Sequence, residues 1–218
     1  MPAYPLAEAA RYLGSNPSTL RAWFHGRNYK VGGEKKWTKA VLPGTQVKGE
    51  PISFLDLIEA HVLLAIRRGY GIPLKRFRTA MDFLQAMGGD LHFLAHREFY
   101  HDKHNLFLKL NENLVSLSER GQLVDKEIIK EGLKQIVYAN DGYAAQFFPR
   151  RDGERQESVV IDPTINFGRP FLTRLGVGAE AIAARFVAGE KISALAQDYA
   201  ATSDEVEEAI RWHERLAA

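Results

Sequence analysis

The 218-residue sequence predicts a mainly α-helical protein with small β elements. Apolar residues recur at helical spacing in several segments, glycines and prolines interrupt these segments, and only short runs have strand character. We expect an amino-terminal helical domain with a β-hairpin at residues 1–90 and a central small α+β segment at 91–149. A linker at 150–158 and a carboxy-terminal three-helix unit at 159–218 complete the chain.

The composition excludes several classes of protein. There is no cysteine, which rules out disulfides, Cys-ligated zinc and thiol nucleophiles. The amino terminus, "MPAYPLAEAARYL", lacks the basic and apolar regions of a signal peptide, and Asp56, Glu59 and His61 interrupt the most apolar run. We therefore expect a cytoplasmic protein without a membrane partner.

The charge is distributed unevenly along the chain. Residues 1–50 carry eight basic and three acidic side chains, a net charge of +5. Residues 176–218 carry four basic and eight acidic side chains, a net charge of −4. The amino-terminal end suits a polyanion, and the carboxy-terminal end does not.

Two short helices joined by a tight turn are predicted within residues 6–25. The apolar residues of the first helix recur at helical spacing: Leu6, Ala9, Ala10 and Leu13. Gly14 is suited to the end of this first helix. For the second helix, Asn16 is suited to the N-cap, Pro17 to the first helical position and Gly26 to the end. The second helix would bury Leu20, Trp23 and Phe24 and expose Ser18, Thr19, Arg21, Ala22 and His25. A helix-turn-helix presents its recognition helix in this way, although a plain helical hairpin is an alternative.

The next segment, "NYKVGGEKKWTKAVLPGTQVKGEPISF", is rich in glycine and lysine. We expect its strands at residues 37–42 and near 52–54, as a wing hairpin whose lysines contact phosphates and release counterions; a solvated loop is the alternative. The predicted DNA-binding residues are Ser18, Thr19, Arg21, Arg27, Lys30, Lys35, Lys36 and Lys39.

Two further helices are predicted after the wing, the first with one apolar face formed by Phe54, Leu57, Ile58, His61, Leu64 and Ala65, and the second at residues 74–87. The succession "AEAARYLGSNPSTLRAWF", wing and "ISFLDLIEAHVLLAIRRGYGIPLKRFRTAMDFL" resembles the winged helix-turn-helix domain of the MerR family. The resemblance covers roughly residues 4–88 and implies that residues 18–23 enter the major groove while residues 54–83 pack behind them. MerR sensors bind effectors through a long dimerisation helix and a distinct carboxy-terminal segment. The sequence shows neither that helix nor a cysteine pair, which argues against effector sensing.

The connector "GGDLHFLAHREFYHDKHNLFLKLN" holds four of the seven histidines. A helical metal site is conceivable from His92, His96, His101 and His104, with Glu98 and Asp102 nearby. No HExxH pattern is present, and surface or packing roles are the favoured interpretation. Beyond it we expect two short strands within 105–123, a helix at 125–139 and a strand at 142–149. The apolar face of that helix would consist of Ile128, Ile129, Leu133, Ile136 and Val137.

Catalytic and cofactor motifs are weak. The stretch "GVGAE" lacks the third glycine of a dinucleotide site, and neither a phosphate-binding loop nor a GxSxG elbow is present. Two groups of acids could bind a metal: Asp56 with Glu59, and Asp204 with Glu205 and Glu208. Each group lies in an amphipathic helix, where solvated or capping acids are expected instead. We therefore expect no catalytic residue, cofactor or metal, with a histidine-metal hydrolase as a remaining alternative.

A three-helix core is predicted at the carboxy terminus from Ile182, Phe186, Ile192, Leu195, Ala196, Val206, Ala209 and Ile210. Thr202 and Glu205 suit a capping box at the start of the last helix. The acidic run at residues 203–208 would repel DNA. We therefore expect this unit to bind a protein partner or a second copy of the chain rather than DNA.

The stretch from Val159 to Trp212 resembles a small prokaryotic domain of unknown function found in antitoxins that are partnered with PIN-like ribonucleases. The matching marks are Asp162-Pro163, Gly168-Arg169-Pro170, "AGE" at 188–190, "LAQDYA" and "SDEVEEAI". The family has a Gly-Thr-Arg triplet where this chain has Leu172-Thr173-Arg174-Leu175, so we expect the strand-to-helix turn to differ. Together with the segment upstream, the resemblance to VapB-like antitoxins covers nearly the whole chain.

That resemblance implies an antitoxin that binds operator DNA as a homodimer, represses its own operon and neutralises a PIN-like ribonuclease. Such ribonucleases hold a metal in an acidic cluster, which a guanidinium can neutralise. The predicted toxin-binding residues are Arg150, Arg151, Arg155, Arg169 and Arg174. Bracing of its own turn is the alternative for Arg169, and solvation is the alternative for the linker arginines. A MerR-like regulator with a small-molecule effector is the alternative function.

Overall fold

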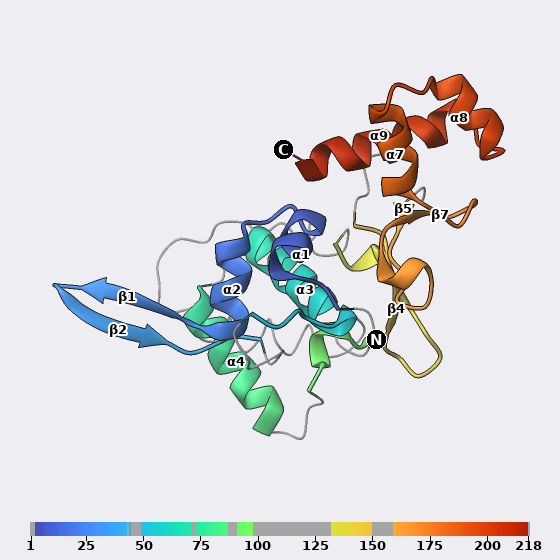
Figure 1. Cartoon of the computed structure of the whole chain (residues 1–218). Coiled ribbons are helices and arrows are strands. Elements are labelled where there is room, and N and C mark those ends of the chain that lie inside the picture. Colours follow the sequence, from blue (N-terminus) through green and yellow to red (C-terminus); the bar gives the residue numbers. More distant parts are fainter. Residues whose placement is uncertain are drawn as a thin grey trace. The chain divides into compact units, whose positions relative to one another are not determined.

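The computed structural model describes residues 3–42, 44, 49–70, 73–86, 91–97, 132–149 and 159–217. The chain forms two compact units, Ala3–Ala144 and a second that begins at Ala145 and includes the carboxy-terminal helices (Figure 1). The described elements are mainly helices, accompanied by small sheets of two or three strands, as predicted. Within the described residues, no helix has both the length and the apolar character of a membrane span.

The first two helices form the predicted helix-turn-helix. Helix α1 spans Leu6–Tyr12. Gly14 follows it with a φ of 57°, and the Ser15 N–H donates to the Ala10 carbonyl at 2.8 Å, which closes a Schellman-type turn. Helix α2 spans Pro17–His25; the Asn16 side chain accepts from the Ser18 N–H at 2.8 Å, and Gly26 ends the helix. Local capping signals therefore set both ends of α2.

The wing follows α2 immediately and lies earlier than predicted. Strand β1, Arg27–Val31, pairs antiparallel with β2, Glu34–Thr38, and the two-residue turn has φ values of 60° and 87° at Gly32 and Gly33. The prediction of strands at 37–42 and near 52–54 is wrong, because a Gly-Gly pair favours a hairpin turn whatever the polarity of its strands. Ile52 instead forms an isolated bridge with Tyr4.

Gly26 fixes the start of the wing, and its replacement provides a test of the fold. The residue has a φ of 71°, and a Cβ there would lie 2.3 Å from the Thr38 carbonyl oxygen and 2.6 Å from a Trp37 ring carbon. We expect Gly26→Ala to lower the free energy of unfolding by about 1–3 kcal/mol, through strain and steric overlap. Urea denaturation measures the loss. Gly32→Ala is the control, since its Cβ would meet nothing within 4 Å. Equal losses in the two variants would refute the packing role of Gly26.

Two longer helices support the helix-turn-helix, close to the predicted bounds. Helix α3 spans Phe54–Tyr70 and α4 spans Leu74–Ala86. The Arg68 guanidinium donates to the Gly14 carbonyl at 3.1 Å, and Arg67 lies 5.8 Å from the Trp23 ring centroid. The largest fully buried side chains of this unit include Leu20, Trp23, Phe24, Leu57, Ile58, Leu63 and Phe77. Helix α3 therefore holds both the turn and the buried face of α2.

In the described part of the central segment, the predicted helix ends earlier than expected. A 3-10 helix, η1, spans Phe93–Ala95, and β3 (Ile136–Tyr138) and β4 (Ala144–Phe147) form a two-stranded sheet. The prediction of a helix through residue 139 is wrong at its end, because Ile136-Val137-Tyr138 is β-branched and aromatic and forms a strand. Val137 is exposed rather than inward. The predicted strands within 105–123, and Ile128 and Ile129, lie outside the described residues. Strand β4 confirms the strand expected within 142–149.

The carboxy-terminal unit places three helices against a small sheet. Strands β5 (Val159–Val160), β6 (Phe171–Leu172) and β7 (Val177–Gly178) pair antiparallel in chain order. Helices α7 (Ala179–Val187), α8 (Ile192–Asp198) and α9 (Ser203–Ala217) follow. Of the predicted core, Ile182, Leu195, Val206, Ala209 and Ile210 are buried, whereas Phe186, Ile192 and Ala196 are half-buried. The sequence did not predict the sheet, because two-residue strands are too short to show alternation.

Candidate functional site

Helix α2 presents the predicted DNA-binding residues on its exposed side. Ser18 and Arg21 are exposed, and Thr19 is half-buried. The Ser18 hydroxyl donates to Asn16 Oδ1 at 2.7 Å, which leaves its oxygen able to accept a hydrogen bond. His25 faces outward less than predicted, since both of its ring nitrogens are buried. Ser18, Thr19 and Arg21 are therefore the polar side chains that α2 offers to a ligand.

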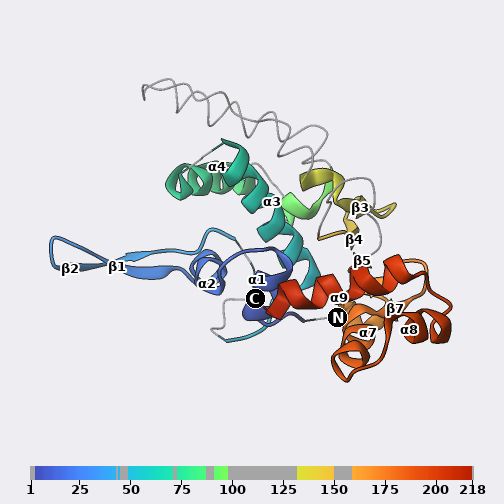
Figure 2. The same cartoon turned by 90° about the horizontal axis from the view of Figure 1, so that it is seen from above.

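The wing carries a set of exposed cations that lack an ion pair within the described part of the chain: Arg27, Lys30, Lys35 and Lys36. The hairpin projects away from the helices of its own unit (Figure 1; Figure 2). Lys30 lies directly opposite Lys35 in the register, a like-charge pair that destabilises a hairpin. The opposed lysines therefore do not stabilise the hairpin by themselves, and a bound polyanion would relieve their repulsion.

Lys39 differs from the other predicted phosphate contacts. It follows β2, and its Nζ lies 3.1 Å from the Asp82 carboxylate on α4, with both side chains more than half exposed. An exposed ion pair of this kind contributes little to stability. Lys39 would have to break its ion pair with Asp82 in order to bind a phosphate, and the loss of that pair would cost little.

The wing also exposes apolar side chains that the sequence did not single out as candidates. Trp37 is 59% exposed, Val31 51% and Tyr29 38%. Trp37 lies on the same face of the hairpin as Lys35, two residues before it in β2, and Tyr29 lies opposite Lys36 on the other face. Aromatic side chains beside cations can pack on sugars or bases. Their exposure on the wing makes these residues candidates for contacts with DNA.

Arg174, a predicted toxin-binding residue, is held within its own unit. Its guanidinium donates to both carboxylate oxygens of Glu205, at 2.7 and 2.6 Å, and to the Ala200 carbonyl at 3.0 Å. The Thr202 N–H donates to the same carboxylate at 2.8 Å and the Glu205 N–H to the Thr202 hydroxyl at 3.2 Å, which confirms the predicted capping box. The hydrogen bond from Arg174 lowers the pKa of Glu205 to about 2. Arg174 therefore links the β6–β7 turn to α9.

Arg169 is held more weakly. It makes a 3.4 Å contact with Glu180, and the side chains of both residues are more than half exposed. Just before it, Asn166 and Phe167 both have positive φ, and Phe167 is 92% exposed. A phenylalanine rarely adopts this backbone region, and no burial offsets the strain here. Arg150, Arg151 and Arg155 lie outside the described residues.

The acids of α9 lie at the surface of the helix, where three of them pair with arginines. Glu207 and Glu208 lie 3.2 and 3.1 Å from the Arg211 guanidinium, and Glu205 pairs with Arg174. Asp204 is exposed. In the described part of the chain, these acids do not form a three-ligand group with metal-binding spacing.

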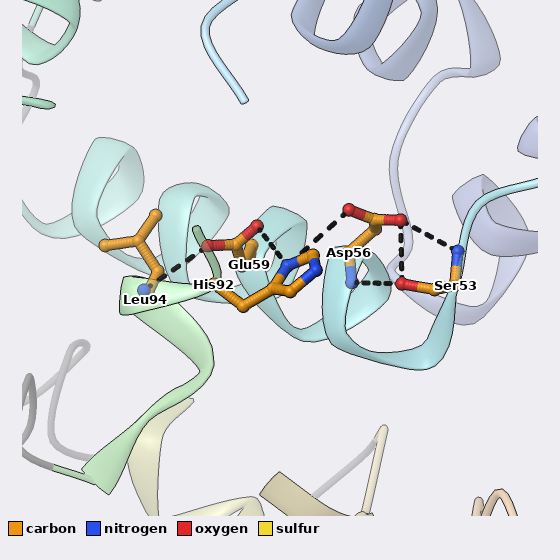
Figure 3. A network of polar contacts seen from close by, with 5 residues as sticks. All are labelled: Ser53, Asp56, Glu59, His92 and Leu94. Atoms are coloured by element: carbon orange, nitrogen blue, oxygen red, sulfur yellow. Dashed lines mark hydrogen bonds and ion pairs between the residues drawn. The ribbon is translucent and has the colours of Figure 1, made fainter. Parts of the chain in front are cut away.

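One of the two acids of α3, Glu59, differs from the prediction. Asp56 caps its helix as expected: its Oδ2 accepts from the Ser53 N–H at 2.9 Å. Glu59, by contrast, is completely buried rather than solvated. Burial raises the pKa of Glu59 to about 7, although the nearby His92 opposes the shift. Figure 3 shows His92 beside both carboxylates.

The helical spacing considered for a metal site at His92 and His96 is absent, because η1 is a 3-10 turn of three residues between them. The His96 ring lies 4.9 Å from that of Tyr143, centroid to centroid, while His92 Nδ1 lies 3.3 Å from Glu59 Oε2. The other residues of the conceivable metal site, Glu98, Asp102, His101 and His104, lie outside the described residues. His92 instead lies beside Asp56 and Glu59 of α3.

These features define a chain with a winged helix-turn-helix unit and a second, separate unit. Residues 2–81 match a family described as "Putative DNA-binding HTH domain", and residues 159–212 match one described as "Protein of unknown function (DUF433)". The chain is 30% identical over 228 residues to "Putative antitoxin VapB45" of Mycobacterium tuberculosis, covering 96% of this chain and 93% of that protein. It also resembles the crystal structure of Rv2018 from M. tuberculosis, with a TM-score of 0.71, 29% identity and coverage of 96% and 98% of the two chains. The chain belongs to the VapB-like antitoxin family.

Proposed function

We propose that this chain is the antitoxin of a type II toxin–antitoxin system and acts in the cytoplasm as a homodimer without catalytic activity. It binds operator DNA, represses its own operon and neutralises a PIN-like ribonuclease by direct contact. The single observation that carries this proposal is the similarity to an antitoxin over 96% of the chain. The DNA-binding match at residues 2–81 supports the operator half of the proposal.

The DNA interface lies in a MerR-like domain at residues 1–90. Ser18, Thr19 and Arg21 face the base edges from α2, and the wing and its flanks contact phosphates through Arg27, Lys30, Lys35, Lys36 and Lys39. The unpaired wing cations and the opposed Lys30 and Lys35 support this assignment.

The toxin interface lies in the domain at 159–218 and the linker at 150–158, joined to the DNA-binding domain by the connector at 91–149. Its cations are Arg150, Arg151, Arg155, Arg169 and Arg174. Arg169 is the stronger of the two described candidates, because its single exposed contact is exchanged easily, whereas Arg174 would give up three hydrogen bonds. Phe167 beside Arg169 supplies an exposed aromatic anchor of the kind that dominates protein interfaces.

Co-expression with the product of the adjacent reading frame tests the proposal. We expect a stable complex on size exclusion, loss of the partner's ribonuclease activity in the complex, and binding of DNA from upstream of the gene pair. A MerR-like regulator would instead bind this DNA alone and release it when a small molecule is added. Absence of a complex, with the partner's ribonuclease activity unchanged by this chain, would refute the antitoxin function.

A further inference from the structure

The DNA-binding unit contains a cluster that the proposed function does not use. Asp56 and Glu59 lie one turn apart on α3, and His92 reaches them from the segment before η1 (Figure 3). One potential ligand atom from each residue lies within 4.8 Å of the others. His92 Nδ1 is 3.3 Å from Glu59 Oε2 and 3.8 Å from Asp56 Oδ1.

The backbone holds each carboxylate in place through one oxygen and leaves the other beside His92. Asp56 Oδ2 accepts from the Ser53 N–H at 2.9 Å and from its hydroxyl at 2.7 Å. Glu59 Oε1 accepts from the Leu94 N–H at 3.3 Å. Such outer contacts orient the ligands of metal sites and fix which oxygen is free.

Asp56 Oδ1 is the observation that points to a missing ligand. Asp56 is 4% exposed, and this oxygen is buried with no hydrogen-bond partner among the residues that the structure describes. The 3.8 Å to His92 Nδ1 is too long for a hydrogen bond. A buried carboxylate oxygen without a partner is costly, and a cation would satisfy it.

The charge balance points the same way. Asp56 and Glu59 bring two carboxyl groups into the interior, and the described residues give neither of them an ion pair with lysine or arginine. Burial disfavours the ionised form of a carboxyl group, and a bound cation would stabilise that form. Buried charges are stable when they are paired or when they coordinate a metal.

We propose that Asp56, Glu59 and His92 bind one divalent transition-metal ion, with Zn²⁺ as the first choice. Metal–ligand distances of about 2.0–2.2 Å place tetrahedral ligand atoms about 3.3–3.6 Å apart, so small shifts of the three side chains complete the site. A mixed imidazole and carboxylate set suits Zn²⁺ or Mn²⁺ better than Ca²⁺ or Mg²⁺, which prefer oxygen ligands alone. The ion fastens residues 91–97 to α3 and leaves a coordination position for water.

Metal titration of the full chain tests this site. After chelator treatment and gel filtration, calorimetric titration with ZnCl₂ is expected to show one saturable site per chain. Glu59→Gln and His92→Ala should each weaken binding at least 10-fold, because each removes a ligand. His96→Ala and His213→Ala are the matched controls and should bind as the unaltered chain does, since these histidines lie outside the cluster.

Co²⁺ titration of the unaltered chain provides a readout that does not depend on the folding of a variant. We expect visible absorption bands that saturate at one equivalent and disappear when Zn²⁺ displaces Co²⁺. Absence of saturable binding in both titrations would overturn the proposal. Undiminished binding by folded Glu59→Gln and His92→Ala, or a loss seen only in His101→Ala or His104→Ala, would also overturn it by placing the site elsewhere.

Discussion

Simultaneous replacement of Lys30, Lys35 and Lys36 by alanine is expected to weaken binding to all DNA sequences alike. Each lysine that neutralises a phosphate adds about 0.9 to the slope of log affinity against log salt concentration. The triple variant should therefore lower that slope by roughly 2–3 per protomer and reduce affinity on the order of 100-fold at physiological salt. Fluorescence anisotropy across a salt series measures both quantities.

A second triple variant controls for the loss of net charge. Lys75, Lys134 and Lys191 are exposed and lie outside the wing and α2, so their replacement by alanine removes the same charge. We expect a much smaller change in the salt slope from this variant. Equal slopes in the two triple variants would show that the wing makes no special contact with phosphates.

Arg21→Ala separates base reading from phosphate binding in the same assay. Its side chain makes no polar contact with the described residues, so its removal leaves the fold of the domain intact. Loss of a bidentate base contact costs about 1–3 kcal/mol at the preferred sequence and little at others. The ratio of operator to non-operator affinity should therefore fall in this variant, whereas the triple wing variant should leave that ratio almost unchanged.

The parts of this fold that local chemistry determines were predictable from the sequence. Asn16, Pro17 and Gly26 set the ends of α2 through their own backbone and capping preferences, and Thr202 does the same for α9. The wing was placed too late in the chain because the residues of β1 are all exposed. Strands with both faces in solvent lack the alternation that reveals a half-buried strand.

The burial of Glu59 shows a second limit of the sequence. Its spacing with Asp56 on α3 was evident, but His92 lies 33 residues further along the chain, and only the tertiary fold brings them together. The exposure of Phe167 was equally hidden, because the Gly168-Arg169-Pro170 turn that follows it does not indicate which side chains point to solvent. The residues that contact DNA and toxin remain predictions from exposure and charge.

Phe167→Ala combined with Arg169→Glu is expected to abolish toxin neutralisation while leaving operator binding unchanged. Phe167 is displayed at 92% exposure on a backbone that disfavours phenylalanine, and Arg169 beside it is held only by a 3.4 Å exposed contact with Glu180. Burial of the ring and pairing of the guanidinium with the toxin's acids would make them central contacts, each worth about 2–4 kcal/mol. The double variant should therefore weaken the complex at least 100-fold, as measured by surface plasmon resonance and by the restored ribonuclease activity.

Val187→Ala combined with Lys191→Glu is the matched control for this surface. Val187 is 74% exposed and Lys191 is exposed, so the pair removes a similar apolar group and reverses one charge elsewhere in the same unit. This control should bind the toxin normally. If the Phe167 and Arg169 variant also inhibits normally while Arg150→Ala, Arg151→Ala and Arg155→Ala together release the toxin, the contact lies in the linker. Normal inhibition by all of these variants would mean that Arg150, Arg151, Arg155 and Arg169 do not neutralise the ribonuclease, and that the interface must be sought at Arg174 or among other residues.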